Sequence, residues 1–311
     1  MSNTVPVFVL NFALSTMIIA MDLLIIFIGI RTKEIRRLLV LHIIFFSMCM
    51  DILAYVNEAV HDVPSYELDK DIFEDSDLKH VSVLVLCCQW FSQLYALIVL
   101  SFIHFVAVFS PTRFRAISTK GIHLINLSII IVSVLLSIPL LTPYCGYAYF
   151  TQGSYWSFDM TRPYTYIYWT FNIALQIVCA LVVALVDFII IWKIYQLRGI
   201  SGLATRNAFT LTQRAVHRNH GRISNEIRLA LNFLLLSVCF LAMTICFNIP
   251  LKNGILKELL TKLTCNLNSA KWAIYALGSP TIRSGVLRFL KCRRNDPTNA
   301  TTSIMGRHTK T

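Results

Sequence analysis

Seven long apolar stretches separated by short polar segments dominate the chain. They cover residues 7–30, 38–60, 81–109, 122–141, 164–192, 227–249 and 266–287. Each reaches about the 20 residues that a helix needs to cross a lipid bilayer. The seventh is the weakest, because it contains Lys271, Arg283 and a Gly-Ser-Pro break, which neighbouring helices can bury. The pattern predicts an all-α membrane protein with a seven-helix bundle at 1–290 and a short tail at 291–311.

The composition supports a chain whose outer surface faces lipid. Of its 311 residues, 56% are hydrophobic and only 14% are charged, and the mean hydropathy is +0.63. Soluble globular domains carry roughly 25% charged residues. A soluble enzyme would lack the charge for its wetted surface, and a disordered chain would need far lower hydrophobicity. Both classes are therefore excluded.

The net charge of +12 would suit a nucleic-acid partner, but its distribution indicates membrane topology instead. Segments 31–37, 110–121, 193–228 and 283–311 hold 21 of the 28 basic residues. Because cytoplasmic loops concentrate Lys and Arg, the N-terminus is predicted outside and the C-terminus in the cytoplasm. We therefore expect a multi-pass protein of the plasma membrane. Its expected partner is the lipid bilayer, and no nucleic-acid partner is expected.

No pattern for catalysis, a cofactor or a metal is found. The sequence has no phosphate-binding glycine loop, no Gly-x-Ser-x-Gly and no His-Glu-x-x-His, and its nine cysteines show no Cys-x-x-Cys spacing. Most cysteines lie in apolar stretches, where cysteine behaves as a small hydrophobe. We expect neither an enzyme nor a metal or cofactor site.

Three carboxylates lie inside the apolar stretches, away from the last few residues at either end, and they stand out because an ionisable group in a membrane is costly and marks a functional site by default. By helix rise, Asp22 and Asp51 fall at mid-depth on antiparallel helices and could meet there. They would form a polar switch or cation site, or simply an interhelical hydrogen bond. Asp187, close to Lys193, is expected to extend to the interface. A transporter or channel subunit using these carboxylates is an alternative function.

The foot of the third stretch resembles a known receptor family. Residues 102–111 read Phe-Ile-His-Phe-Val-Ala-Val-Phe-Ser-Pro, followed by Arg113 and Arg115. This segment is similar to that of G-protein-coupled receptors, and most closely to the nematode serpentine chemoreceptors of the Srx class. Phe105, Ala107 and Pro111 match that class, whereas Ile103 and His104 stand where it has Asn-Arg.

Other matches are spread along the chain. Asp22 stands where these receptors have a first-helix Asn, and Asp51 near their second-helix Asp. Residues 145–149 and 156–158 are similar to the Srx second outer loop, and 225–228 to the start of its sixth helix. Of the family's Asn-Pro-x-x-Tyr motif, the segment 279–283 keeps only the proline.

The resemblance implies a rhodopsin-like receptor that binds an external small-molecule or peptide ligand and couples to a heterotrimeric G protein. It also implies a chemosensory role and a location on a sensory cilium. The G-protein face would comprise His104, Pro111, Arg113, Glu226 and Arg228, with Glu226 as the partner of His104. Since His104 replaces the family's arginine, a receptor-like protein that does not signal is a further alternative.

The resemblance also suggests two groups of binding residues. A ligand pocket at the top of the bundle would be lined by Leu86, Cys87, Trp90, Tyr168, Phe171, Asn172, Phe247, Lys271 and Tyr275, although core packing explains any single aromatic among them. Deeper in the bundle, Gln93 and Ser279 would join Asp51 around a small cation or water site. Lys271 is expected at the membrane interface, where it could attract an anionic ligand.

Two cysteines have family-based roles. Cys145 in the second outer loop would form a disulfide with Cys87, Cys88 or Cys265, or remain unpaired. Cys292 lies beside Lys291 and Arg293 just inside the membrane, a position at which cysteine can be palmitoylated. A free thiol is the alternative there.

Overall fold

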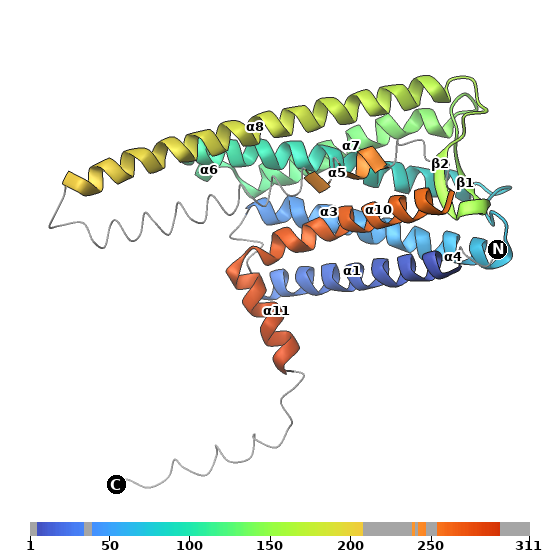
Figure 1. Cartoon of the computed structure of the whole chain (residues 1–311), viewed down its shortest axis with the longest axis horizontal. Coiled ribbons are helices and arrows are strands. Elements are labelled where there is room, and N and C mark those ends of the chain that lie inside the picture. The colour runs from blue at the N-terminus through green and yellow to red at the C-terminus, as the bar shows by residue number, and fades with distance from the viewer. Residues whose placement is uncertain (1–4, 34–38, 208–237, 240–241, 247–253, 293–311) are drawn as a thin grey trace, which may run out of the picture.

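The computed structural model describes residues 5–33, 39–207, 238–239, 242–246 and 254–292. In this part of the chain long helices run side by side along one axis, and a small β-hairpin lies across one end of the bundle (Figure 1). We call this the hairpin end, and the opposite end, where α6 lies, the α6 end. The expectation of an all-α membrane fold is confirmed.

The long helices are α1 (Val5–Arg31), α3 (Leu39–Asn57), α5 (Leu78–Phe109), α7 (Thr119–Ser137), α8 (Thr165–Asn207) and α10 (Gly254–Leu277). The short ones are η1 (Glu58–Asp62), α4 (Val63–Leu68), α6 (Pro111–Ala116), η2 (Ile138–Leu141), η3 (Thr151–Gly153) and α11 (Pro280–Cys292). Within the described ranges, five helical segments are long and apolar enough to cross a membrane, and they correspond to the first five stretches of the sequence. Most of the sixth stretch, 227–249, lies outside the described residues.

The outward faces of the peripheral helices are apolar. On α8, for example, the exposed side chains include Ile177, Leu181, Leu185 and Phe188, which follow one helical stripe. The outer faces of α1 and α7 carry similar stripes. A soluble protein would not expose this much continuous apolar surface, so these faces are suited to lipid.

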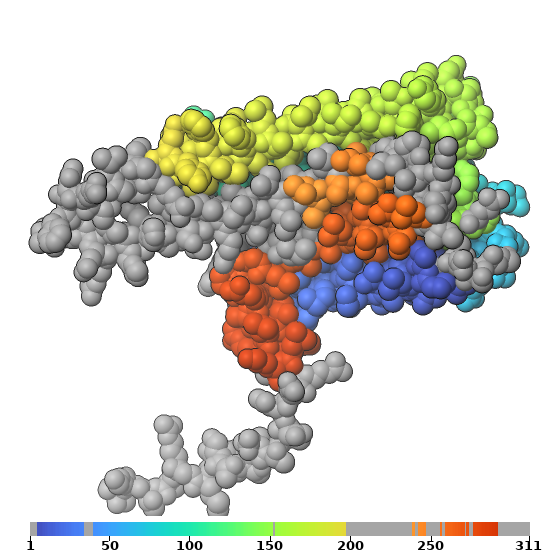
Figure 2. Space-filling model, viewed as in Figure 1, coloured from blue at the N-terminus to red at the C-terminus, as the bar shows by residue number. Residues whose placement is uncertain are grey.

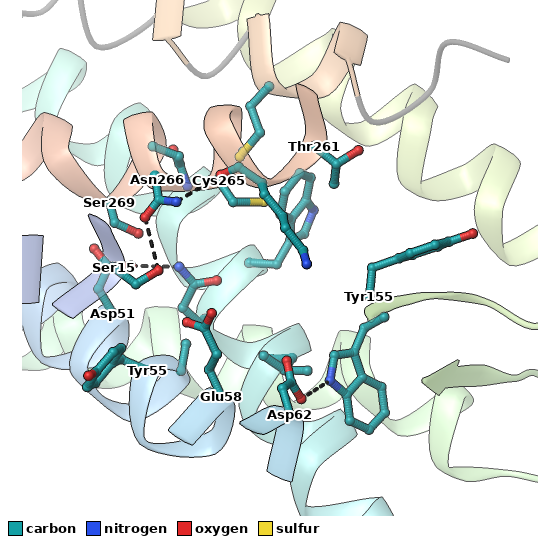
Figure 3. A pocket seen from close by; sticks show the side chains of 18 of the residues that line it. Ser15, Asp51, Tyr55, Glu58, Asp62, Tyr155, Thr261, Cys265, Asn266 and Ser269 are labelled. Carbon is teal, nitrogen blue, oxygen red and sulfur yellow. Dashed lines mark hydrogen bonds between the residues drawn. The ribbon is translucent and has the colours of Figure 1, made fainter. Parts of the chain in front are cut away.

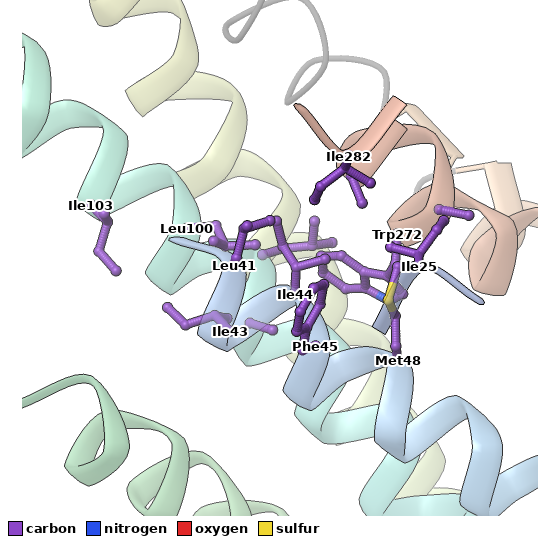
Figure 4. Close-up of a cluster of buried hydrophobic side chains, with 14 of the residues drawn as sticks. Ile25, Leu41, Ile43, Ile44, Phe45, Met48, Leu100, Ile103, Trp272 and Ile282 are labelled. Atoms are coloured by element: carbon purple, nitrogen blue, oxygen red, sulfur yellow. The ribbon is translucent and has the colours of Figure 1, made fainter. Parts of the chain in front are cut away.

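Helix α5 is the central helix, because it packs against α3, α7 and α8, while α1 packs against α3 and α10. The main hydrophobic core lies where α1, α3, α5 and α10 meet, and Figure 4 shows Trp272 among side chains of α3 such as Met48. Gly29 permits a close approach there, because a Cβ atom on it would lie 2.3 Å from the ring of Phe45.

The seventh stretch, expected as one span at 266–287, is divided between two helices. Helix α10 begins 12 residues earlier, at Gly254, and ends at Leu277; Gly278 and Ser279 form a turn, and α11 then leaves the bundle at a steep angle (Figure 2). The division follows from α11 being amphipathic. Ile282 and Val286 are buried, whereas its basic residues, Arg283 included, are exposed.

Two helices extend beyond the stretches that predicted them. Helix α3 continues through the π-helical turn η1 into α4, which ends at Leu68, so the following loop is only 69–77. Helix α8 continues to Asn207, well past the expected end at 192. Hydropathy detects only the apolar length of a helix and not its polar ends, which explains why both helices are longer than expected.

The hairpin consists of β1 (Tyr147–Phe150) and β2 (Tyr155–Phe158), paired antiparallel with Tyr147 opposite Phe158. Tyr149, Trp156 and Phe158 are buried against Cys87 and its neighbours in a second hydrophobic cluster. The hairpin is thus packed onto the end of the bundle.

Candidate ligand cavity

A cavity of about 250 Å³ lies in the hairpin end of the bundle, between α1, α3, α5, α8 and α10 and under the hairpin. Figure 3 shows that Glu58 and Asp62 point into one open space, with Ser15 and Asn266 on one side and Tyr155 of β2 on the other. Its polar lining residues are Asn11, Ser15, Asp51, Glu58, Asp62, Gln89, Ser154, Asn172, Thr261, Lys262, Asn266, Asn268 and Ser269. The size and the mixed lining are suited to a compact ligand.

One wall of the cavity is a chain of side-chain hydrogen bonds across three elements. The hydroxyl of Ser15 donates to Oδ1 of Asn266 at 3.0 Å, and Nδ2 of Asn266 donates to Oδ1 of Asn11 at 2.7 Å. Nδ2 of Asn11 then donates to Oε1 of Glu58 at 2.8 Å. This chain joins α10, α1 and η1, and it fixes the Glu58 carboxylate at the cavity.

The rim of the cavity is fastened around His61, which is fully buried. Its Nδ1 lies 2.6 Å from Oδ1 of Asp62, and its Nε2 lies 2.9 Å from Oδ1 of Asp71. The indole N–H of Trp156 donates to the same Asp62 oxygen at 2.9 Å. The π-helical turn, the 69–77 loop and the hairpin are therefore held together at one point.

The base of the hairpin is held by Asp159. Its carboxylate accepts hydrogen bonds from the hydroxyl and the N–H of Thr161, at 2.6 and 3.1 Å, and lies 3.5 Å from Nε of Arg162. Mainly because of the Thr161 hydroxyl, the pKa of Asp159 is below its usual value. Burial, by contrast, raises the pKa of the Tyr147 phenol, so this ring forms a neutral part of the wall.

The floor of the cavity is a buried polar cluster around Asp51. Gln89 and Gln93, one turn apart on α5, each donate a side-chain N–H to Oδ1 of Asp51 at 2.6 Å. Oε1 of Gln93 accepts a hydrogen bond from the indole N–H of Trp272. This cluster joins α3, α5 and α10 at mid-depth.

Asp22 lies within electrostatic range of Asp51, as the helix rise predicted. It is fully buried, and neither carboxylate oxygen has a hydrogen-bond partner among the described residues. Ser279 is not part of this cluster. It lies in the turn after α10, where its N–H donates to the carbonyl of Ala276, because the helix ends before reaching it.

Most of the expected pocket residues in the described part line the cavity, namely Leu86, Cys87, Trp90, Tyr168 and Asn172. Phe171 does not: its side chain is 47% exposed on the outer face of α8, one residue away from the inward-facing Asn172. Phe247 and the side chains of Lys271 and Tyr275 lie outside the described residues.

At the α6 end, His104 is buried on α5, Pro111 begins α6, and Arg113 is exposed on α6. Glu226 and Arg228 lie outside the described residues. Asp187 does not reach the interface as expected. It is buried, and the hydroxyl of Ser101 on α5 donates to its Oδ1 at 2.8 Å, because Asp187 faces the central helix rather than lipid.

Cys87, Cys88, Cys145 and Cys265 are all free thiols in the structure, so none of the suggested disulfides is present. Cys145 and Cys87 are instead buried in the hydrophobic cluster under the hairpin. Cys292 is the last residue of α11, and its side chain lies outside the described part, so palmitoylation stays a prediction.

The sequence reading missed several cavity residues. The hydropathy pattern assigns no role to Glu58, Asp62, Asn11, Ser15 and Asn266. A signal was present, since Asn11 and Ser15 are four residues apart and thus share one helix face, as do Glu58 and Asp62.

The overall fold of the chain is similar to that of a solved structure. The crystal structure of squid rhodopsin matches with a TM-score of 0.69 and 15% sequence identity, over 94% of this chain and 88% of that chain. No protein-family model and no curated protein matches the sequence. The chain therefore has the rhodopsin-like fold of G-protein-coupled receptors.

Proposed function

We propose that the chain is a G-protein-coupled receptor that binds a compact external ligand in the cavity at the hairpin end. The observation that carries the proposal is a mixed polar and aromatic cavity enclosed by the helices of a rhodopsin-like bundle. The nematode chemosensory class, and with it a place on a sensory cilium, is supported by the resemblance of residues 102–111 to Srx receptors.

The charge at the two ends supports an orientation with the hairpin end outside. The α6 end carries Arg31, Lys33, Arg113, Arg115 and Lys193. The hairpin end carries the acidic 58–77 segment. Because basic residues favour the cytoplasmic side, α6 and the far end of α8 would face the G protein. Ligand binding would shift the packing of α8 against α5, as helix shifts do in other switches.

The proposal is tested in cells that express the full chain together with a reporter of G-protein activation. A chemically diverse panel of small molecules and peptides is applied, and any response is compared with that of a variant lacking 200–222. We expect a ligand-evoked response that the deletion abolishes while surface expression persists. Ligand-evoked currents or uptake in a reconstituted system without any G protein would contradict the receptor and support a transporter or channel.

A receptor-like protein that does not signal is the second candidate, and buried His104 favours it. The resembling class has an arginine there that contacts the G protein, whereas an imidazole is shorter and offers fewer donors. His104→Arg separates the two candidates. Signalling that appears only in this variant supports the silent protein, and signalling by the unaltered chain excludes it.

A further inference from the structure

The charges that line the cavity are predominantly negative. Among the described lining residues the carboxylates are Asp51, Glu58 and Asp62, and Lys262 is the ammonium. Asp51 is bound by two amide donors at the floor. Glu58 and Asp62 lie nearer the hairpin and point side by side into the open space (Figure 3). Their juxtaposition in a partly enclosed space favours a positive charge between them.

Neighbouring residues hold these two carboxylates but use only one oxygen of each in the hydrogen bonds described above. Asn11 donates to Oε1 of Glu58. His61 and Trp156 both contact Oδ1 of Asp62, whose side chain keeps 14% exposure. The side chains are thus oriented in advance, which lowers the cost of binding a ligand there.

An independent hydrogen-bond acceptor at the cavity lies on another helix. Asn172 of α8 lines the cavity with 5% of its surface exposed, and its Oδ1 has no hydrogen-bond partner among the described residues. A buried acceptor without a donor is costly. A ligand that brings N–H groups into the cavity would satisfy it.

Aromatic rings complete the hairpin side of the cavity. Tyr147, Tyr155 and Trp156 line it from the two strands, and Trp90 lines it from α5. The electron-rich faces of such rings attract ammonium groups, and their edges accommodate apolar ones. A carboxylate pair with aromatic walls is a site for organic cations rather than for inorganic ions.

We propose that this cavity binds a compact organic cation, a protonated or quaternary amine attached to an apolar group, between Glu58, Asp62 and the aromatic hairpin wall. The proposal rests on the proposed function, because it names the ligand class of that same receptor. Lys262 sets its limits. Its Nζ lies 4.9 Å from the centre of the Phe8 ring, and the ammonium is within electrostatic range of both Glu58 and Asp62. It therefore offsets part of their negative charge and repels a second positive charge on the ligand. The ligand carries one cationic group.

The test uses the purified full chain in lipid nanodiscs and three probes of the same shape: phenethylammonium, neutral 2-phenylethanol and anionic 3-phenylpropionate. Tetramethylammonium tests the ammonium alone. Binding is measured by calorimetry and by thermal stabilisation, without any G protein. We expect phenethylammonium to bind at least tenfold more tightly than the other two shape-matched probes. Weaker binding of the cation than of the anion, or no binding of either ammonium at millimolar concentration, overturns the proposal.

Charge variants localise the site. Glu58→Gln is expected to weaken phenethylammonium binding about tenfold, and Lys262→Met to strengthen it. Glu74→Gln, which removes an exposed acid from the 69–77 loop, is the matched control and leaves affinity unchanged. Since Asp62→Asn can loosen the hairpin, it serves as a second variant, checked by its melting temperature. Unchanged affinity in both Glu58→Gln and Asp62→Asn overturns the proposal.

The two proposals fail separately. Cation binding to the purified chain without any G-protein response in cells leaves the site standing and removes the receptor function. A response in cells to neutral or anionic ligands alone, with no cation binding, supports the receptor function and overturns the cation site.

Discussion

The indole N–H of Trp272 on α10 donates a hydrogen bond to Oε1 of Gln93 on α5, 179 residues earlier in the chain. Gln93 in turn donates to Asp51 on α3. Both Trp272 and Gln93 are fully buried, so the bond is shielded from water and from lipid. The floor of the cavity is therefore a polar junction of three helices, and its integrity should control both stability and ligand affinity.

Replacing Trp272 by Phe tests this junction. The change keeps an aromatic ring but leaves Gln93 Oε1 without its donor, which costs about 1–3 kcal/mol. We expect the melting temperature in detergent to fall by about 3–8 °C. The effect of Trp272→Phe combined with Gln93→Leu should be smaller than the sum of the two single effects. Additive effects would show that the two residues are not coupled.

Asp22 and Asp51 should respond in opposite ways to the same substitution. Asp22→Asn removes a buried carboxylate that lacks hydrogen-bond partners among the described residues, so thermal stability should rise. Asp51→Asn weakens the acceptor of the two charge-assisted bonds from Gln89 and Gln93, so stability should fall by about 2 kcal/mol. Thermal unfolding of both variants in the same detergent is the measurement. A loss of stability in Asp22→Asn would show that this carboxylate has a favourable partner.

His61→Ala should release the rim of the cavity. The substitution removes the group between Asp62 and Asp71 and leaves two carboxylates facing a hole, which costs about 3 kcal/mol. We expect faster proteolysis at Lys70 in the adjoining loop and a lower melting temperature. His80→Ala, on an exposed histidine of α5, is the control and should behave like the unaltered chain. Equal cleavage rates in both variants would argue against the rim contact.

Gly29→Ala should strain the contact between α1 and α3. The added Cβ would lie 2.3 Å from Cζ of Phe45, so the ring must move within a packed core. Overpacking of this kind costs about 1–3 kcal/mol, partly offset by about 1 kcal/mol of helix propensity. Gly121→Ala, where the nearest atom would be 3.6 Å away, is the control. Thermal unfolding should show a loss only for Gly29→Ala.

The helical bundle was predictable because lipid imposes a simple rule on sequence. The lipid-facing side chains of α8, such as Leu181 and Leu185, are apolar, and so are its buried ones. Hydropathy alone therefore reveals this helix. The approach of Asp22 to Asp51 was also predictable, because helix rise fixes depth in the membrane. Helix face was harder to assign. Asn172 and Phe171 were both expected in the pocket, and only Asn172 faces it.

The features that hydropathy missed are those that depend on contacts between distant segments. Nothing near His61 in the sequence indicates that it will lie between Asp62 and Asp71 and beneath Trp156. The sequence predicts only an outer loop where the hairpin lies, because a pair of four-residue strands gives little periodic signal. The end of α10 was placed too late, since the buried Ile282 and Val286 of α11 resemble a continuing span.

Helix α8 has a mechanical consequence. Its apolar span ends at Gln196, but the helix continues to Asn207, which carries it about 16 Å further. The same helix begins at Thr165, close to the cavity, where Tyr168 and Asn172 form part of the wall. A tilt of the helix at the cavity would therefore also move its Asn207 end, which lies beyond the apolar span.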